Sequence, residues 1–353
     1  MESVRGDCAF DAAAKYKGIY RSGPVTGHNT PPMYKNKPLS VALAATAGAP
    51  SQHRAAGLVL ALVGAIAFSA KAIIVKLAYR HGVDAVTLIM YRMLFALPFF
   101  LAICWWTGTP RNGAVVAQLS RQDILGVLGL GVTGYYLASF FDFAGLAYIS
   151  ASLERLILYL NPTLVLLLGW ALYGRRITRP QAVGMAISYS GVLLVFGHEV
   201  QFAGANVALG AILVFLSAVS YAIYLSYSGE LVKRLGSLRL VGLATSVACV
   251  LCIAQFLVLR PMSAALEVAP AVVWLSLLNG TLCTVVPVLL VMMAIERIGS
   301  GLAAQIGMVG PMSTITMGVI FLGEPFGGFV VTGTVLVLIG IFVCSKSGRV
   351  PGR

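Results

Sequence analysis

Six ionisable residues interrupt apolar stretches that are long enough to cross a lipid bilayer. They are Lys71, Lys76, Arg92, Asp142, Glu154 and Arg155. At the centre of a membrane helix each charge costs about 2.5–3.5 kcal/mol on insertion scales, so six unpaired charges would cost on the order of 15–20 kcal/mol. That sum exceeds the net stability of a typical domain. The six groups must therefore pair, reach water from a helix end, or line a water-filled cavity.

The depth of these groups separates two kinds of role. Lys76 lies one turn from a helix end and can extend its ammonium group into water. The deeper groups comprise three cations and two carboxylates. One interpretation is a structural salt-bridge network that joins the first helices. The other is a water-accessible pocket whose unmatched positive charge suits a carboxylate or another anionic group.

A proline interrupts one of these apolar stretches near its middle. Asn161 and Pro162 stand there together, and proline leaves the carbonyl of Leu158 without its helical donor. Such breaks occur in membranes where polar groups or a cavity satisfy the backbone. Glu154 precedes Asn161 by seven residues, and we expect the two to share one helix face.

Pro311 marks the matching point in the second half of the chain, with Gln305 shortly before it. Each proline alone is explained by a packing kink. Their occurrence at equivalent positions favours a hinge or a binding site at both breaks.

Hydroxyl and amide side chains provide a second group of candidate residues. Ser217, Tyr221, Tyr224 and Ser228 are spaced four, three and four residues apart and fall on one helix face, with Tyr135 and Asn279 on other helices. Such a stripe is compatible with buried packing. It also suits the wall of a pocket for an aromatic or amphipathic metabolite.

The elements that position these residues are membrane helices. The chain of 353 residues is 59% hydrophobic and 10% charged, whereas soluble domains are about a quarter charged. About 20 apolar residues form one membrane-spanning helix. The sequence predicts an all-α integral membrane protein with spans at 57–79, 85–106, 123–147, 151–173, 180–198, 207–229, 238–259, 271–294, 300–322 and 325–345.

Basic residues predict the orientation of these helices. Most of the 25 Lys and Arg residues fall before the first span, in alternate loops and in the tail. This positive-inside pattern places both termini in the cytoplasm and explains the net charge of +13 without nucleic acid. We expect residues 1–54 to form a disordered cytoplasmic arm and 347–353 a cytoplasmic tail. Met33 is an alternative start.

An internal repeat organises the ten predicted spans. Shifting the chain by 149 residues lays 131–196 over 280–345 without a gap, so that Gly184 meets Gly333 and Gly191 meets Gly340. Arg175 meets Glu324, which gives the matched loops opposite charge. The repeat predicts two five-helix halves, 55–198 and 207–346, inserted with inverted topology.

Two matching segments carry a family resemblance. They read SASLERLILYLNPTLVLLLGWALYGRRITRPQAVGMAISYSGVLLVFG and GSGLAAQIGMVGPMSTITMGVIFLGEPFGGFVVTGTVLVLIGIFVCS. Their pattern resembles the tandem EamA repeat of the drug/metabolite transporter superfamily, although Arg175-Arg176 stands where that family often has an acidic residue. The resemblance implies a ten-helix secondary transporter of small metabolites, amino acids among them, in the bacterial inner membrane. We expect export by alternating access, with protons as a candidate coupling ion.

Other classes of function find less support. The four histidines fall in the arm or in loops, and neither an H-E-x-x-H nor a nucleotide-binding motif occurs. We therefore expect no enzyme, no cofactor and no metal site. A membrane receptor or scaffold without transport remains the alternative. The partners implied are the lipid bilayer and a small-molecule substrate, and the sequence leaves the oligomeric state open.

Overall fold

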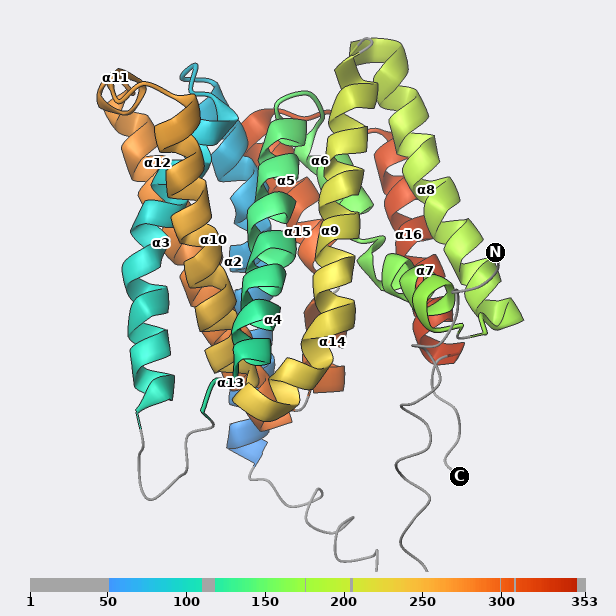
Figure 1. Ribbon diagram of the computed structural model, residues 1–353. Helices are drawn as coiled ribbons and strands as arrows, with labels where there is room; N and C mark the ends of the chain where they lie inside the picture. Colours follow the sequence, from blue (N-terminus) through green and yellow to red (C-terminus); the bar gives the residue numbers. More distant parts are fainter. Residues whose placement is uncertain are drawn as a thin grey trace, which may run out of the picture. The chain divides into compact units, whose positions relative to one another are not determined.

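The described part of the chain folds into helices and turns without a strand (Figure 1). The computed structural model describes residues 51–109, 118–174, 176–203, 206–298, 300–307 and 309–347. The predicted arm and tail therefore lie largely outside the described residues, and Arg175 lies outside them as well.

The helices follow the two predicted halves. The first half contains α2 (Ser51–Tyr79), α3 (Ala85–Gly108), α4 (Arg121–Gly131), the π-helix η1 (Val132–Leu137), α5 (Ala138–Leu146), α6 (Ala151–Leu158), α7 (Asn161–Tyr173) and α8 (Arg179–Ala203). The second half contains α9 (Asn206–Leu235), α10 (Ser237–Leu259), α11 (Ser263–Leu266), α12 (Pro270–Gly280), η2 (Thr281–Val285), α13 (Val286–Ile298), α14 (Ser300–Gly307), α15 (Gly310–Met317), η3 (Gly318–Leu322) and α16 (Gly328–Ser347).

Within these described residues, eight helical segments are long and apolar enough to cross a membrane. They correspond to the first eight predicted spans. The last two predicted spans correspond to shorter apolar helices, Gly310–Leu322 and Gly328–Cys344. The ninth predicted span, 300–322, is divided between α14 and α15, and the apolar stretch that corresponds to the tenth runs from Gly328 to Cys344.

Glycines on α8 and α16 pack the two halves against each other. A Cβ atom on Gly184 would lie 2.7 Å from the carbonyl oxygen of Gly340, and one on Gly340 would meet the carbonyl oxygen of Gly184. Likewise, Cβ atoms on Gly191 and Gly333 would lie 2.6 and 2.7 Å from each other's carbonyl oxygens. Because Gly184 is equivalent to Gly333 and Gly191 to Gly340, the contact is reciprocal. Equivalent helices therefore run antiparallel, as inverted repeats require.

A second reciprocal contact extends this relation to the first helix of each half. Gly57 on α2 packs against Ile298, and Gly210 on α9 packs against Ile149, which is the equivalent isoleucine. The two π-helices η1 and η2 also begin at equivalent positions. The repeat thus covers both halves although their first helices share little sequence.

The two helices that the sequence predicts to break near Pro162 and Pro311 are both broken there. The first break separates α6 from α7, and Asn161 Nδ2 donates to the Leu158 carbonyl at 2.7 Å. This bond satisfies the acceptor that Pro162 leaves without a donor. Pro311 begins α15 in the same way. The expectation that Glu154 and Asn161 share one helix face is wrong, because the break between α6 and α7 removes their common register.

The bundle has two distinct ends, which we name from Figure 1. The upper end holds the turns α2–α3, α5–α6 and η3–α16, and the lower end holds the start of α2 and the ends of α9 and α13. Asp84 caps α3 at the upper end by accepting the backbone N–H groups of Val86 and Thr87. The candidate site lies between these ends.

Candidate functional site

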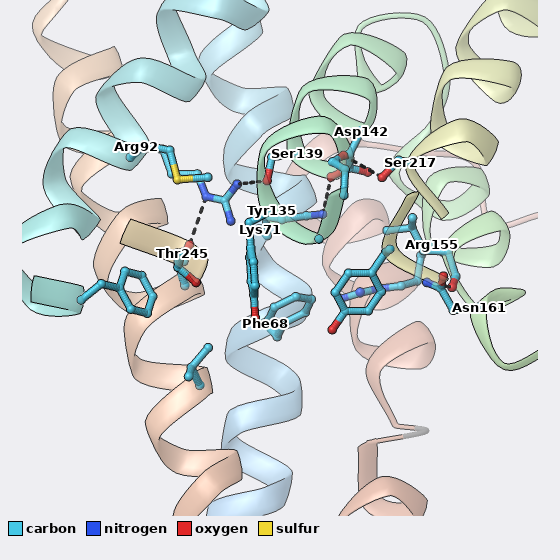
Figure 2. A pocket seen from close by; sticks show the side chains of 18 of the residues that line it. Phe68, Lys71, Arg92, Tyr135, Ser139, Asp142, Arg155, Asn161, Ser217 and Thr245 are labelled. Atoms are coloured by element: carbon cyan, nitrogen blue, oxygen red, sulfur yellow. Dashed lines mark hydrogen bonds and ion pairs between the residues drawn. The ribbon is translucent and has the colours of Figure 1, made fainter. Parts of the chain in front are cut away.

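A central cavity of about 340 Å³ holds most of the deep charges. Its walls come from α2, α3, η1, α5, α6, α7, α9, α10, η2 and α13, so both halves contribute. The polar residues that line it are Lys71, Arg92, Tyr135, Ser139, Asp142, Arg155, Tyr159, Asn161, Ser217, Tyr221, Thr245 and Thr284. Figure 2 shows Arg92 on one side, Lys71 and Asp142 in the middle, and Arg155 with Asn161 on the other side.

One lysine contacts both buried carboxylates. Lys71 Nζ lies 2.5 Å from Asp142 Oδ2 and 3.2 Å from Glu154 Oε1. All three side chains are buried, and Glu154 is 0% exposed. Within the described residues, Asp142 Oδ1 and Glu154 Oε2 have no hydrogen-bond partner. A cation shared by two carboxylates leaves acceptor capacity on each of them.

Arg92 reaches the cavity from α3 and is held by hydroxyl groups. Its Nε donates to Thr284 Oγ1 at 3.1 Å, and its Nη1 donates to Ser139 Oγ at 3.3 Å. The guanidinium carbon lies 5.1 Å from the centre of the Phe143 ring, within cation–π range. These contacts fix the guanidinium plane but use only part of its five donors.

Arg155 is held in a comparable way on α6. Its Nε donates to Thr314 Oγ1 at 2.9 Å, and its guanidinium lies 5.7 Å from the centre of the Phe68 ring. Thr314 is anchored in turn, because its hydroxyl contacts the Gly310 carbonyl on its own helix at 3.2 Å. A threonine of the second half thus orients an arginine of the first.

The cavity has an excess of positive charge. Among the described residues, the ion pairs of the deep cluster are those of Lys71, and neither Arg92 nor Arg155 has a carboxylate within 4.0 Å. Three cations therefore stand with two carboxylates in a buried site. Buried charges that lack a partner are expensive, so an anionic group that entered the cavity would offset a cost already present.

Tyrosines form the wall between this cavity and a second one. The rings of Tyr221 and Tyr224 stack with centres 5.5 Å apart, and Tyr135 meets Tyr224 edge-on at 5.2 Å. The second cavity, of about 560 Å³, shares Phe68, Tyr135 and Tyr221 with the first and continues past Val232 and Ile295 toward the lower end. The central cavity is thus adjacent to a larger apolar space.

The structure brings together most of the residues that the sequence singled out. Eight of them line the central cavity, namely Lys71, Arg92, Tyr135, Asp142, Arg155, Asn161, Ser217 and Tyr221. Glu154 contacts the ammonium group of Lys71, and Tyr224 lines the second cavity. Pro162 and Pro311 stand at the helix breaks. Asn279 is buried and lines neither of these cavities, although its backbone carbonyl accepts a hydrogen bond from the cavity-lining Thr284 Oγ1 at 2.8 Å. The side chain of Gln305 lies outside the described residues.

Several lining or supporting residues were not predicted, among them Phe68, Tyr159, Thr245 and Thr314. Helical spacing contained a signal for two of them, since Phe68 precedes Lys71 by three residues and Tyr159 follows Arg155 by four. Thr245 and Thr314 reach the site only through tertiary packing, which sequence spacing does not encode.

Comparisons with known proteins match this architecture. The EamA-like transporter family matches residues 55–197 and 208–346, one match for each half. The uncharacterized transporter YcbK of Bacillus subtilis (strain 168) is 31% identical, over 80% of this chain and 90% of that protein. An uncharacterized transporter of Archaeoglobus fulgidus is 26% identical, over 73% of this chain and 92% of that protein.

A solved structure, titled only as the crystal structure of a protein, shares the fold. It has a TM-score of 0.57 at 17% identity and covers 84% of this chain and 99% of its own. The double family match, the relative covering most of the chain and the reciprocal helix contacts agree with one another. The chain is a multi-pass membrane protein and belongs to the EamA-like transporter family.

Proposed function

We propose that this transporter exports a small metabolite that carries a carboxylate and an aromatic or apolar body, by alternating access across the bacterial inner membrane. The observation that carries the proposal is the central cavity, in which two arginines lack a carboxylate partner among the described residues. The family supports transport by a membrane protein. The site residues supply the argument for the substrate.

Charge balance supports a carboxylate. Three cations and two carboxylates leave one positive charge, which the carboxylate of a substrate would neutralise. Arginine binds carboxylates through two parallel N–H···O bonds. Both arginines keep unused N–H groups, because their described contacts are single hydroxyl bonds from Nε and, for Arg92, one more from Nη1.

The aromatic side chains support an apolar body beside that carboxylate. Phe68, Tyr135 and Tyr221 line the wall that both cavities share. A volume of about 340 Å³ suits a small metabolite. Aromatic walls bind flat apolar groups by stacking or edge contacts.

Protons are the coupling ion that we propose. Lys71 contacts Asp142 and Glu154 at once, so movement of the lysine would leave two carboxylates side by side. Two adjacent carboxylates interact strongly and tend to share a proton. Proton uptake at this pair would then alternate with binding of the substrate.

The proposed orientation has the lower end and both termini in the cytoplasm. The basic residues of the alternate loops support it. The larger cavity continues toward the same end, which supports loading from the cytoplasm.

The substrate class is tested by tracer counterflow in proteoliposomes. Phenylalanine, phenylpyruvate and phenylacetate are each compared with the corresponding amide, which keeps the size but lacks the anionic group. We expect at least one acid to be exchanged and its amide to be exchanged on the order of tenfold less, because the charge-assisted bonds are lost. Equal exchange of every acid and its amide would contradict the carboxylate proposal.

A further inference from the structure

Glu324 of the second half binds the start of α6 in the first half. Its Oε1 accepts the Ala151 N–H at 2.7 Å, while its Oε2 accepts the Ser152 N–H at 3.3 Å and the Ser152 hydroxyl at 2.8 Å. The next N–H, that of Leu153, bonds to the Ser150 hydroxyl. The free N–H groups of this helix start are therefore satisfied, two of them by a carboxylate from the opposite repeat.

The helix that Glu324 binds carries two groups of the central site. Glu154 and Arg155 lie in the first turn and a half of α6, which has only eight residues. A short helix depends on its caps and tertiary contacts for its orientation. A carboxylate at its N-terminus also interacts favourably with the helix dipole. Glu324 thus fixes the helix that presents Glu154 to Lys71 and Arg155 to the cavity.

The local backbone is shaped to admit this carboxylate. Glu324 follows the π-helix η3, and its N–H donates to the Gly318 carbonyl at 3.1 Å. A Cβ atom on Gly318 would lie 2.9 Å from Glu324 Oε2, closer than real Cβ contacts. Gly318 therefore leaves room for the carboxylate to reach α6.

Only a thin layer separates the central cavity from the upper end. A separate pocket of about 320 Å³ borders Glu324 and is also lined by Lys76 and Ala147 among others. Lys76 is five residues beyond Lys71, and Ala147 is five beyond Asp142, which corresponds to about 7.5 Å of helix. Buried side chains fill the layer, among them those of Val75, Leu146 and Ala151.

We infer that Glu324 is a positioning residue that latches the upper end of the bundle. Its carboxylate holds α6 in the orientation that closes the layer above the central cavity. Release of the carboxylate from α6 lets the η3–α16 turn move away and exposes the cavity to the upper side. The inference rests on the proposed alternating access, and it adds the contact that must break in each cycle.

The latch is tested by measuring from which side of the membrane a cysteine in the cavity can be labelled. Ser139 lines the central cavity, so Ser139→Cys in a chain otherwise free of cysteine reports access. An anionic, membrane-impermeant methanethiosulfonate is added to intact cells and to inverted vesicles. We expect Glu324→Ala to raise the labelling rate from the upper side roughly tenfold, which corresponds to about 1.4 kcal/mol, a typical value for a charged helix cap. Glu324→Gln, whose amide oxygen still accepts one bond, should fall between wild type and alanine.

Two further variants make the result decisive. Glu267 is exposed at the same end, and Glu267→Ala should leave labelling unchanged. Gly318→Ala keeps the carboxylate but displaces it from α6, so it should also raise labelling from the upper side. If the Glu324→Ala protein fails to reach the membrane, the labelling rate of Gly318→Ala tests the inference in its place. If Gly318→Ala and Glu324→Ala were both labelled no faster than wild type and Glu267→Ala, the inference would be overturned.

Failure of the latch and failure of the proposed function give different results. Labelling reports exposure of the cavity and needs no substrate. A shift in labelling without counterflow of any acid would keep the latch and reject the proposed substrate class. Counterflow of an acid without a change in the labelling rate would support the proposed substrate class and reject the latch.

Discussion

At the scale of single residues, the site depends on arginines that are oriented by neutral groups. Arg92 and Arg155 each bond through Nε to a threonine from the second half and each lie against a phenylalanine ring. These contacts hold the guanidinium groups without neutralising them. Their remaining donors have no carboxylate partner among the described residues, which is the basis for the proposal that they bind a ligand.

The arginine side chain itself provides the residue-scale prediction. Arg92→Gln keeps a polar group of similar length but removes the charge, so the apparent affinity for the transported acid should fall. Loss of a charge-assisted hydrogen bond costs about 1.5–3 kcal/mol, or roughly 10- to 150-fold in KM. Counterflow kinetics in proteoliposomes measure this change.

Arg297→Gln is the matched control for that experiment. Arg297 is exposed near the lower end, and its Nη1 bonds only to a backbone carbonyl of its own helix in the described contacts. We expect its KM to match that of wild type. Equal KM values for Arg92→Gln and Arg297→Gln would show that the charge of Arg92 does not contribute to substrate binding.

Sequence reasoning identified the charged residues of the site but not how they are supported. Charges inside apolar spans stand out because they are costly, which made Lys71 and Arg92 visible. Thr314 is an ordinary helix residue in sequence, and its bond to Arg155 arises from the packing of α15 against α6. Such cross-helix partners cannot be read from the sequence of one helix.

At the scale of elements, two glycine pairs define how the halves meet. On α8 and α16 the backbones of equivalent glycines touch, as in other closely packed membrane helices. Because the contact is reciprocal, it relates one repeat to the other and does not depend on the less similar first helices. The sequence aligned these glycines as equivalent repeat positions, but it could not show which glycine contacts which.

This packing leads to the element-scale prediction. In Gly340→Ala the new methyl group would meet the Gly184 carbonyl and the Ser188 backbone, neither of which can turn aside. Such overpacking typically costs about 1–3 kcal/mol. We expect a lower midpoint of thermal unfolding in detergent than for wild type.

Gly197→Ala is the control on the same helix pair. Apart from the backbone of its own helix, no atom of the described residues lies within 4 Å of the position of a Cβ on Gly197. Alanine favours a helix over glycine by about 0.5–1 kcal/mol. Its midpoint should equal or exceed that of wild type. If both variants unfold at the same temperature, the glycine contact contributes nothing to the interface.

At the scale of the whole molecule, the helical fold is repeated in both halves, but the charged site is not. The helix breaks, the π-helices η1 and η2 and the glycine contacts recur in both halves. Among the described residues, the deep charges come from the first half, and Glu324 of the second half binds the start of the helix that carries two of them. The repeat made the fold predictable. The site depends on positions at which the two halves differ, so the repeat could not predict it.

The central claim is that the halves move relative to each other to expose the cavity on alternate sides. A Cβ atom on Gly318 would lie 3.8 Å from Ser152 Oγ, so Ser152→Cys with Gly318→Cys can be joined by a disulfide or a short thiol cross-linker across the upper end. Because both substitutions also disturb the contact of Glu324 with α6, the reduced double variant is the reference in place of wild type. Counterflow of the acid that the wild-type protein exchanges is measured before and after oxidation, with each single cysteine variant as control. Alternating access predicts that counterflow stops in the oxidised double variant and returns on reduction. Undiminished counterflow through the cross-linked protein would contradict the claim.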